Sequence, residues 1–396
     1  MNNNLPSIIQ CSSNSKSFYV FEDILFIGND KGFIEIFNWK KENKIFDIDL
    51  YPNKDLIEDP DKKNNKQIIN IILISNENYD FLFQSRGGDI FIGNINLKDN
   101  KWKQYNKIET KIESFTKFKI CFNEKIRKSN IKKYEENKNE NWKFSIITPN
   151  EKENQIKIYE VSNKYMILHG YEKKMYFSNE IENDESDSES ENENLEIRKS
   201  LICNIIVNEK KQIIILAFES SVIGIYNLQL EYLCHLKLFK EKEEAIITIS
   251  LFEFENEIFL SVGCFSPNLL ILKVSNDFKS ISKFKILKNA CSDLKQGISS
   301  IIYGEGKRED LLSEENEINK FNILFIGNYD KRIKLFNINK KNNEIIFSDM
   351  GNIITNSNGI INQIYFLSSN DNDSDSINYY LFVCCEQRLF YIYLIA

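Results

Sequence analysis

Residues 24–38 read ILFIGNDKGFIEIFN. Two runs rich in Ile and Phe, which favour β-strands, flank the segment Asn29-Asp30-Lys31-Gly32, whose residues tolerate positive φ. The stretch is therefore predicted to form a β-hairpin. Residues 24–27 are apolar at every position, which indicates a strand that is covered on both of its faces.

The same pattern of strand, short turn and second strand occurs seven times along the chain. The copies begin at Ile24, Phe81, Phe144, Ile214, Phe259, Ile323 and Leu381. Residues at or next to the turns are predicted to have a structural role in the repeat, and these are Gly28, Asp30, Gly32, Gly87, Gly263, Gly327, Asp330 and Arg332.

Further short apolar stretches lie before and after most copies, such as 298–303 before the sixth and 345–349 after it. Four strands per repeat are typical of the blades of a β-propeller, whose sheets stack face to face around a channel. The last copy lacks a fourth strand, and residues 5–11 precede the first copy. We therefore predict an all-β fold, a single seven-bladed WD40-type β-propeller whose ring is closed by an N-terminal strand.

The predicted domain is 1–396, and its repeats differ in length because polar segments interrupt them. Blades are expected at about 12–51, 67–108, 111–177, 200–239, 245–288, 297–349, and 360–396 plus 5–11. The segments at about 53–66, 124–141, 178–199, 305–319 and 368–378 are too polar to bury. They are predicted to be disordered low-complexity insertions in loops.

Charge and cysteine usage restrict the class of protein. The net charge is −7, from 51 Lys plus Arg and 58 Asp plus Glu, so neither sign dominates and direct nucleic-acid binding is not expected. Eight cysteines without CxxC spacing indicate reduced thiols in the cytoplasm and/or nucleus. Residues 1–10 lack the pattern of a signal peptide and no apolar run approaches ~20 residues, so neither secretion nor membrane association is expected.

The sequence contains few residues suited to catalysis. His169 and His235 are its only histidines, and no nucleophile elbow, phosphate-binding loop, dinucleotide motif or zinc-protease motif is present. Asp371 and Asp373 lie in a Ser/Asn/Asp tract and are interpreted as a solvated loop. We therefore predict no enzymatic activity, no catalytic or metal-ligating residue and no cofactor.

An acidic segment at 182–196 contains three candidate phosphorylation sites, Ser186, Ser188 and Ser190. Each serine has a glutamate three positions later, a setting that acidophilic kinases favour. Phosphorylation would deepen the negative charge, and one hypothesis is that this loop docks a basic surface of a partner. The alternative is a solvated insert without a role.

Several further stretches allow a comparison with a known family. Gly297-Ile298, followed by GNYDKRIKLF at 327–336, resembles the signature of the penultimate blade in the ASTRA-associated protein 1 family, also called the G-protein β-subunit-like protein 1 group. Gln387-Arg388-Leu389 is similar to its closing hairpin, and Thr148-Pro149 to its proline-bearing turn. No blade keeps a Trp-Asp ending or a Gly-His pair, so the Asp–His hydrogen bond of regular WD blades is not expected and hydrophobic packing should hold the ring.

The resemblance implies a non-enzymatic scaffold. It implies cooperation with the Tel2-Tti1-Tti2 assembly and AAA-ATPase chaperones in the assembly and stability of phosphatidylinositol-3-kinase-related kinases, or a role in an associated chromatin complex. Two alternatives stay open: a propeller hydrolase similar to diphthine methylesterase, and a generic WD-repeat scaffold in ribosome assembly or trafficking.

Overall fold

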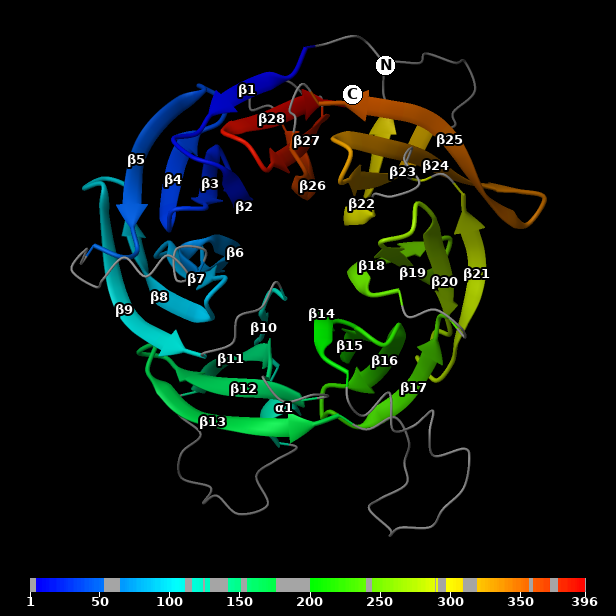
Figure 1. The fold of residues 1–396 in the computed structure, drawn as a ribbon, viewed down its shortest axis with the longest axis horizontal. Coiled ribbons are helices and arrows are strands. Elements are labelled where there is room, and N and C mark those ends of the chain that lie inside the picture. Colours follow the sequence, from blue (N-terminus) through cyan, green and yellow to red (C-terminus); the bar gives the residue numbers. More distant parts are fainter. Residues whose placement is uncertain are drawn as a thin grey trace. The chain divides into compact units, whose positions relative to one another are not determined.

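The chain folds almost entirely into β-sheet (Figure 1). The computed structural model describes residues 5–52, 65–110, 116–123, 125–128, 142–150, 155–175, 200–239, 244–288, 290, 297–308, 319–355, 359–370 and 377–395. Within these residues the strands form seven four-stranded sheets, and the one helix is the four-residue α1 (Lys125–Lys128). The predicted all-β fold, a seven-bladed β-propeller, is confirmed.

Each sheet is one blade, and the strands of the first six blades follow chain order. Blade 1 contains β2 (Ser15–Phe21), β3 (Ile24–Asn29), β4 (Phe33–Asn38) and β5 (Asn43–Asp49); blade 2 contains β6 (Ile68–Ser75), β7 (Asp80–Ser85), β8 (Asp89–Asn96) and β9 (Lys101–Glu109); blade 3 contains β10 (Lys119–Cys121), β11 (Trp142–Pro149), β12 (Gln155–Ser162) and β13 (Ile167–Lys174). Blade 4 contains β14 (Ile202–Asn208), β15 (Ile213–Phe218), β16 (Val222–Asn227) and β17 (Tyr232–Lys237); blade 5 contains β18 (Ile246–Phe254), β19 (Glu257–Cys264), β20 (Leu269–Val274) and β21 (Ile281–Leu287). Blade 6 contains β22 (Ile298–Arg308), β23 (Asn319–Asn328), β24 (Arg332–Lys341) and β25 (Glu344–Ile354); blade 7 contains β26 (Ile361–Asn370), β27 (Ile377–Cys385), β28 (Leu389–Leu394) and β1 (Ser7–Gln10).

The chain divides into two compact units. Unit 1 consists of Met1–Ile71, Gly263–Leu270 and Ile286–Ala396, and unit 2 of Ile72–Val262 and Ile271–Lys285. Blades 1, 6 and 7 belong to unit 1, and blades 3 and 4 belong to unit 2.

The N-terminal strand completes the last blade, as the sequence predicts. Strand β1 pairs antiparallel with β28, from Ser7 opposite Ile392 to Gln10 opposite Leu389. The pairing continues past the strand end, where the Cys11 backbone N–H donates to the Arg388 carbonyl over 2.7 Å. Blade 7 is therefore built from both ends of the chain.

Unit 1 is held together by two apolar clusters on opposite sides of blade 7. One cluster joins β27 and β28 to blade 1 and includes Phe18, Leu25 and Cys384, while the other joins blade 7 to blade 6 and includes Phe325 and Cys385. Consecutive strand residues point to opposite faces, so the adjacent cysteines enter different clusters. This explains why a run such as 381–385 is apolar at every position.

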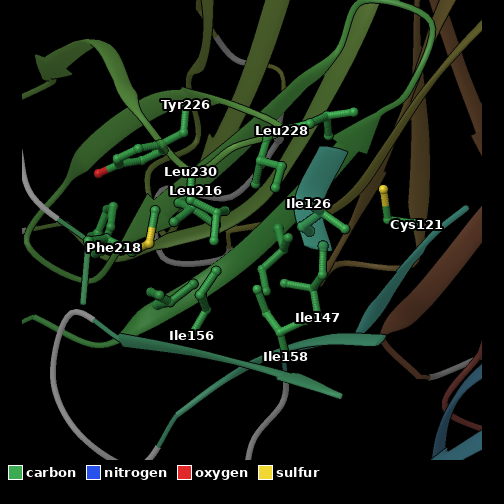
Figure 2. Packing of buried hydrophobic residues seen from close by; sticks show 14 of the residues in the cluster. Cys121, Ile126, Ile147, Ile156, Ile158, Leu216, Phe218, Tyr226, Leu228 and Leu230 are labelled. Atoms are coloured by element: carbon green, nitrogen blue, oxygen red, sulfur yellow. The ribbon is translucent and has the colours of Figure 1, made fainter. Parts of the chain in front are cut away.

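Unit 2 repeats this arrangement between blades 3 and 4 (Figure 2). Ile147, Ile156 and Ile158 of blade 3 pack with Leu216 and Phe218 of blade 4, and all five side chains are fully buried.

Helix α1 contributes to the same cluster through Ile126, which is also fully buried. The Ile126 carbonyl accepts a hydrogen bond from the Tyr171 hydroxyl over 3.1 Å. The predicted disordered insertion at 124–141 is therefore wrong at its beginning, because an isolated isoleucine in a basic run gains more from filling this gap than from exposure to water.

Two other predicted insertions are shorter than the sequence suggests. Strand β22 continues to Arg308 and β23 begins at Asn319, while β26 continues to Asn370 and β27 begins at Ile377. The sequence does not reveal these longer strands, because the residue pairs at the added strand ends are polar and include Lys, Asn and Ser. The segments 53–64 and 178–199 lie outside the described residues.

Two of the repeated glycines provide room for the next blade. A Cβ on Gly28 would lie 2.7 Å from Cγ2 of Ile68, and one on Gly327 would lie 2.8 Å from Cγ2 of Ile361. Both isoleucines are fully buried and begin the first strand of the following blade. The requirement for glycine at these strand ends is steric rather than conformational.

We expect Gly327→Ala to lower the free energy of unfolding by about 1–3 kcal/mol, because the added methyl group overpacks a filled interface. Urea unfolding followed by circular dichroism measures this loss. Gly170→Ala is the matched control, since its Cβ would meet only the Tyr159 ring, at 3.2 Å. Equal losses in the two variants would contradict the steric role of Gly327.

Candidate interaction site

The repeat residues predicted from the sequence gather at the connections between second and third strands. Asp30 and Gly32 lie in the β3–β4 turn, Gly87 in the β7–β8 turn and Asp330 in the β23–β24 turn. Gly28, Gly263 and Gly327 lie near the ends of β3, β19 and β23, and Arg332 begins β24. All except Gly87 belong to unit 1.

Side chains within these turns set their local conformation. Asn29 Oδ1 accepts hydrogen bonds from the backbone N–H groups of Lys31 and Phe33, over 2.9 and 3.0 Å. Gly32 has φ +89°, which a residue with a Cβ rarely adopts. In the β23–β24 turn, Asp330 Oδ1 accepts from the Arg332 N–H over 3.2 Å. Each turn is therefore closed by a short polar side chain, as expected from its composition.

A buried carboxylate anchors the turn of blade 1. The Glu35 side chain is fully buried in β4 and accepts hydrogen bonds from the Ser12 backbone N–H and hydroxyl at 2.9 Å each, and from Asn29 Nδ2 at 3.1 Å. Lys44 Nζ lies 3.1 Å from Glu35 Oε2. Burial raises the pKa of Glu35, but these hydrogen bonds outweigh it and the net pKa lies below the ordinary value. Blade 1 is therefore held by buried polar contacts as well as by hydrophobic packing. From the missing Asp–His pair, hydrophobic packing alone is expected.

These turns carry an aromatic pair, of which Phe265 is exposed and Tyr329 is half-buried. Phe265, in the β19–β20 turn, is 58% exposed, and its ring stacks on that of Tyr329 in the β23–β24 turn with centroids 6.4 Å apart. Burial, followed by the nearby charge of Glu386, raises the pKa of Tyr329. Glu386, in the β27–β28 turn, pairs with Lys16 at the start of β2. We call Phe265, Tyr329, Glu386 and Lys16 the turn patch.

The turn patch was not predicted from the sequence. Phe265 and Tyr329 occupy turn positions in two copies of the repeat, and in each turn they stand beside small or charged residues. An aromatic residue in a short polar turn is the one signal that could have identified them. Their stacking could not have been predicted, because the two residues are 64 positions apart and meet only through the packing of unit 1.

The remaining candidate residues lie elsewhere. His169 lies in β13 with its ring 5.9 Å from Tyr171, and His235 lies in β17, where Nδ1 is 2.7 Å from the Tyr232 hydroxyl. Burial lowers the pKa of His235. Ser186, Ser188 and Ser190 lie outside the described residues.

The described part of the chain contains no group of three or more His, Cys, Asp or Glu residues that could hold a metal ion. Seven cysteines lie in that part, and all are free thiols. A search of the same residues for a helix long and apolar enough to cross a membrane finds none.

Comparisons with known proteins identify the fold. No family model matches the chain, and no curated protein matches it. Among solved structures, the β-propeller domain of Cps50 (Swd1) from Myceliophteria thermophila matches with a TM-score of 0.61 and 12% identity over 99% of each chain. Saccharomyces cerevisiae Sqt1 matches with a TM-score of 0.53 and 11% identity, over 98% of this chain and 84% of that one. Chaetomium thermophilum Raptor matches with a TM-score of 0.58 and 11% identity over 100% of this chain, which spans only 29% of the Raptor chain. At these identities the likenesses show the fold alone, and that fold is the β-propeller.

Proposed function

We propose that this protein is a non-enzymatic scaffold that binds other proteins through the turn patch. One observation carries the proposal: the large apolar side chain of Phe265 is exposed to water, although its ring stacks on Tyr329 within a well-packed unit. Aromatic side chains fixed on a rigid support are typical centres of protein interfaces, because they bury a large area with little loss of conformational freedom.

The ion pair beside the aromatic residues supports the same function. Lys16 and Glu386 come from opposite ends of the chain, and the Glu386 charge lies near Tyr329. A polar rim around an apolar centre gives orientation and specificity to a contact. The turn patch combines both features across the turns of three blades and the first strand of blade 1.

The proposed partners follow from the family resemblance of residues 297–336. We propose that the scaffold acts with the Tel2-Tti1-Tti2 assembly and AAA-ATPase chaperones in stabilising phosphatidylinositol-3-kinase-related kinases or an associated chromatin complex. The cellular compartment proposed is the cytoplasm and/or nucleus, which agrees with the seven free thiols. A hydrolase function is not proposed, because no described observation favours it.

We expect the double variant Phe265→Ala/Tyr329→Ala to lose at least about tenfold in recovery of stable protein partners, since truncation of interface centres typically costs this much. Affinity purification of the full chain from its own cells, with quantitative mass spectrometry, measures the recovery. Phe265 is exposed but Tyr329 is partly buried, so a thermal unfolding curve establishes that the double variant folds.

Met350→Ala is the matched control, because Met350 is 44% exposed and lies on β25 of the same unit. Its partner recovery should equal that of the unmodified chain. Absence of any stable partner would contradict the scaffold function. Recovery of ribosomal or trafficking proteins in place of the chaperone assembly would retain the scaffold and overturn the proposed partners.

A further inference from the structure

A strained turn in unit 2 is held in place from several sides. Tyr165, between β12 and β13, has φ +60°, a conformation that is unfavourable for a bulky side chain. Its N–H donates to the Ser162 carbonyl over 2.9 Å, and its own carbonyl accepts from Asn106 Nδ2 of β9 over 3.1 Å. The same positive φ occurs at Leu230 and Phe278, whose N–H groups also donate to the carbonyl three residues earlier, so it is a property of this type of turn.

The Tyr165 side chain makes further contacts that hold the turn in place. Its hydroxyl donates to the buried carboxylate of Asp80 and accepts from the Lys143 ammonium, which also lies 4.2 Å from the ring centroid. The Tyr105 ring of β9 stacks parallel to it, with centroids 5.2 Å apart and an angle of 5°. The turn is thus fixed to blade 2 by both a hydrogen bond and a ring stack.

The consequence of this conformation is an exposed apolar surface. Ile167 packs inward against the cluster between blades 2 and 3, whereas Met166 and Leu168 on either side of it are 56% and 42% exposed. The pairing of β12 with β13 slips at this point, so that Val161 lies opposite Ile167 while Glu160 lies opposite His169. Tyr105 adds a third apolar side chain, 37% exposed, and is joined to the turn by the ring stack.

The charged side chains within the two segments that form this surface are all lysines. Lys101 and Lys103 are exposed on β9, and Lys164 is exposed in the turn. Lys103 Nζ lies 5.6 Å from the centroid of the Tyr105 ring. Residues 101–105 and 163–169 contain no Asp or Glu, although the whole chain carries a net charge of −7. We call Lys101, Lys103, Tyr105, Lys164, Met166 and Leu168 the lysine patch.

We propose that the lysine patch is a second docking surface, separate from the turn patch, and that its occupant is an acidic protein segment with a leucine or phenylalanine side chain. The apolar side chain of the segment would cover Met166, Leu168 and Tyr105, because exposed apolar patches of this kind mark binding sites. Its carboxylates would lie against the three lysines, whose charges complement them.

Selection from a displayed library of random peptides about twelve residues long, against the immobilised full chain, tests the proposal. The selected peptides should be acidic and carry Leu or Phe. Two patch variants, Lys103→Glu/Lys164→Glu and Met166→Ser/Leu168→Ser, should each weaken a selected peptide at least about tenfold by calorimetric titration. The affinity should also fall as salt is raised, because the contacts are charged and exposed.

Lys41→Glu/Lys210→Glu is the matched control, since both lysines are exposed in turns outside the patch, and it should bind as the unmodified chain does. Phe265→Ala/Tyr329→Ala should also retain binding, which separates this proposal from the function of the turn patch. Circular dichroism melts establish that the variants fold. Peptides that are basic, that bind the patch variants unchanged, or that fail to emerge from the selection would overturn the proposal.

Discussion

Replacement of Ile9 by Asp is expected to lower the free energy of unfolding by about 3–5 kcal/mol, through loss of a filled site and burial of an unpaired charge. Ile9 is 3% exposed and lies in the cluster formed with Phe18, Leu25 and Phe390. Because β1 is the fourth strand of blade 7, its loss also leaves the edge of β28 without hydrogen-bond partners. Urea unfolding of the full chain, followed by circular dichroism and tryptophan fluorescence, measures the change.

The neighbouring residue provides an internal control. Ile8 lies on the same strand but is 42% exposed, because successive side chains of a strand face opposite sides. Ile8→Asp should change the free energy of unfolding by less than about 1 kcal/mol, as is usual at exposed positions. Similar effects of the two substitutions would mean that β1 does not hold unit 1 together.

The strands could be predicted from the sequence because both of their faces are buried. Residues 381–385 are apolar at consecutive positions, and the structure places them alternately in two clusters on the two faces of blade 7. A run of this kind must be covered on both faces. Few folds with four strands per repeat provide that cover. The N-terminal strand could be predicted in the same way, because a last blade with only three strands would leave one edge of its sheet uncovered.

The interaction surfaces could not be predicted in this way, because they depend on contacts between distant residues. Tyr165 appears in the sequence as an ordinary turn residue, yet its hydroxyl contacts Asp80 and Lys143 and its carbonyl contacts Asn106. Ile126 lies in a basic run, and only the gap between blades 3 and 4 explains its burial. In each case the contacts join residues of different repeats, so the sequence pattern within one repeat could not predict them.

Glu35 is the clearest example, because the stretch FIEIF resembles a strand with one solvent-facing charge. The structure instead buries the carboxylate among Ser12, Asn29 and Lys44. Glu35→Ala leaves these donors without their acceptor, and we expect the free energy of unfolding to fall by about 2–4 kcal/mol at neutral pH. Glu257→Ala is the matched control: its pair with Lys273, at 2.9 Å, is exposed and should contribute about 0–1 kcal/mol.

The pH dependence distinguishes loss of the carboxylate charge from loss of packing. The pKa of Glu35 in the folded chain lies below its ordinary value, so the charge stabilises the fold above the unfolded pKa, and this contribution is lost as the pH falls through the folded pKa. Glu35→Gln keeps the shape but lacks the titration. The difference in unfolding free energy between the unmodified chain and Glu35→Gln should therefore be largest at neutral pH and shrink as the pH falls below about 4.3. A difference that stays constant between neutral and acidic pH would show that the carboxylate charge of Glu35 does not contribute to stability, and the buried carboxylate would then not be what anchors the turn of blade 1.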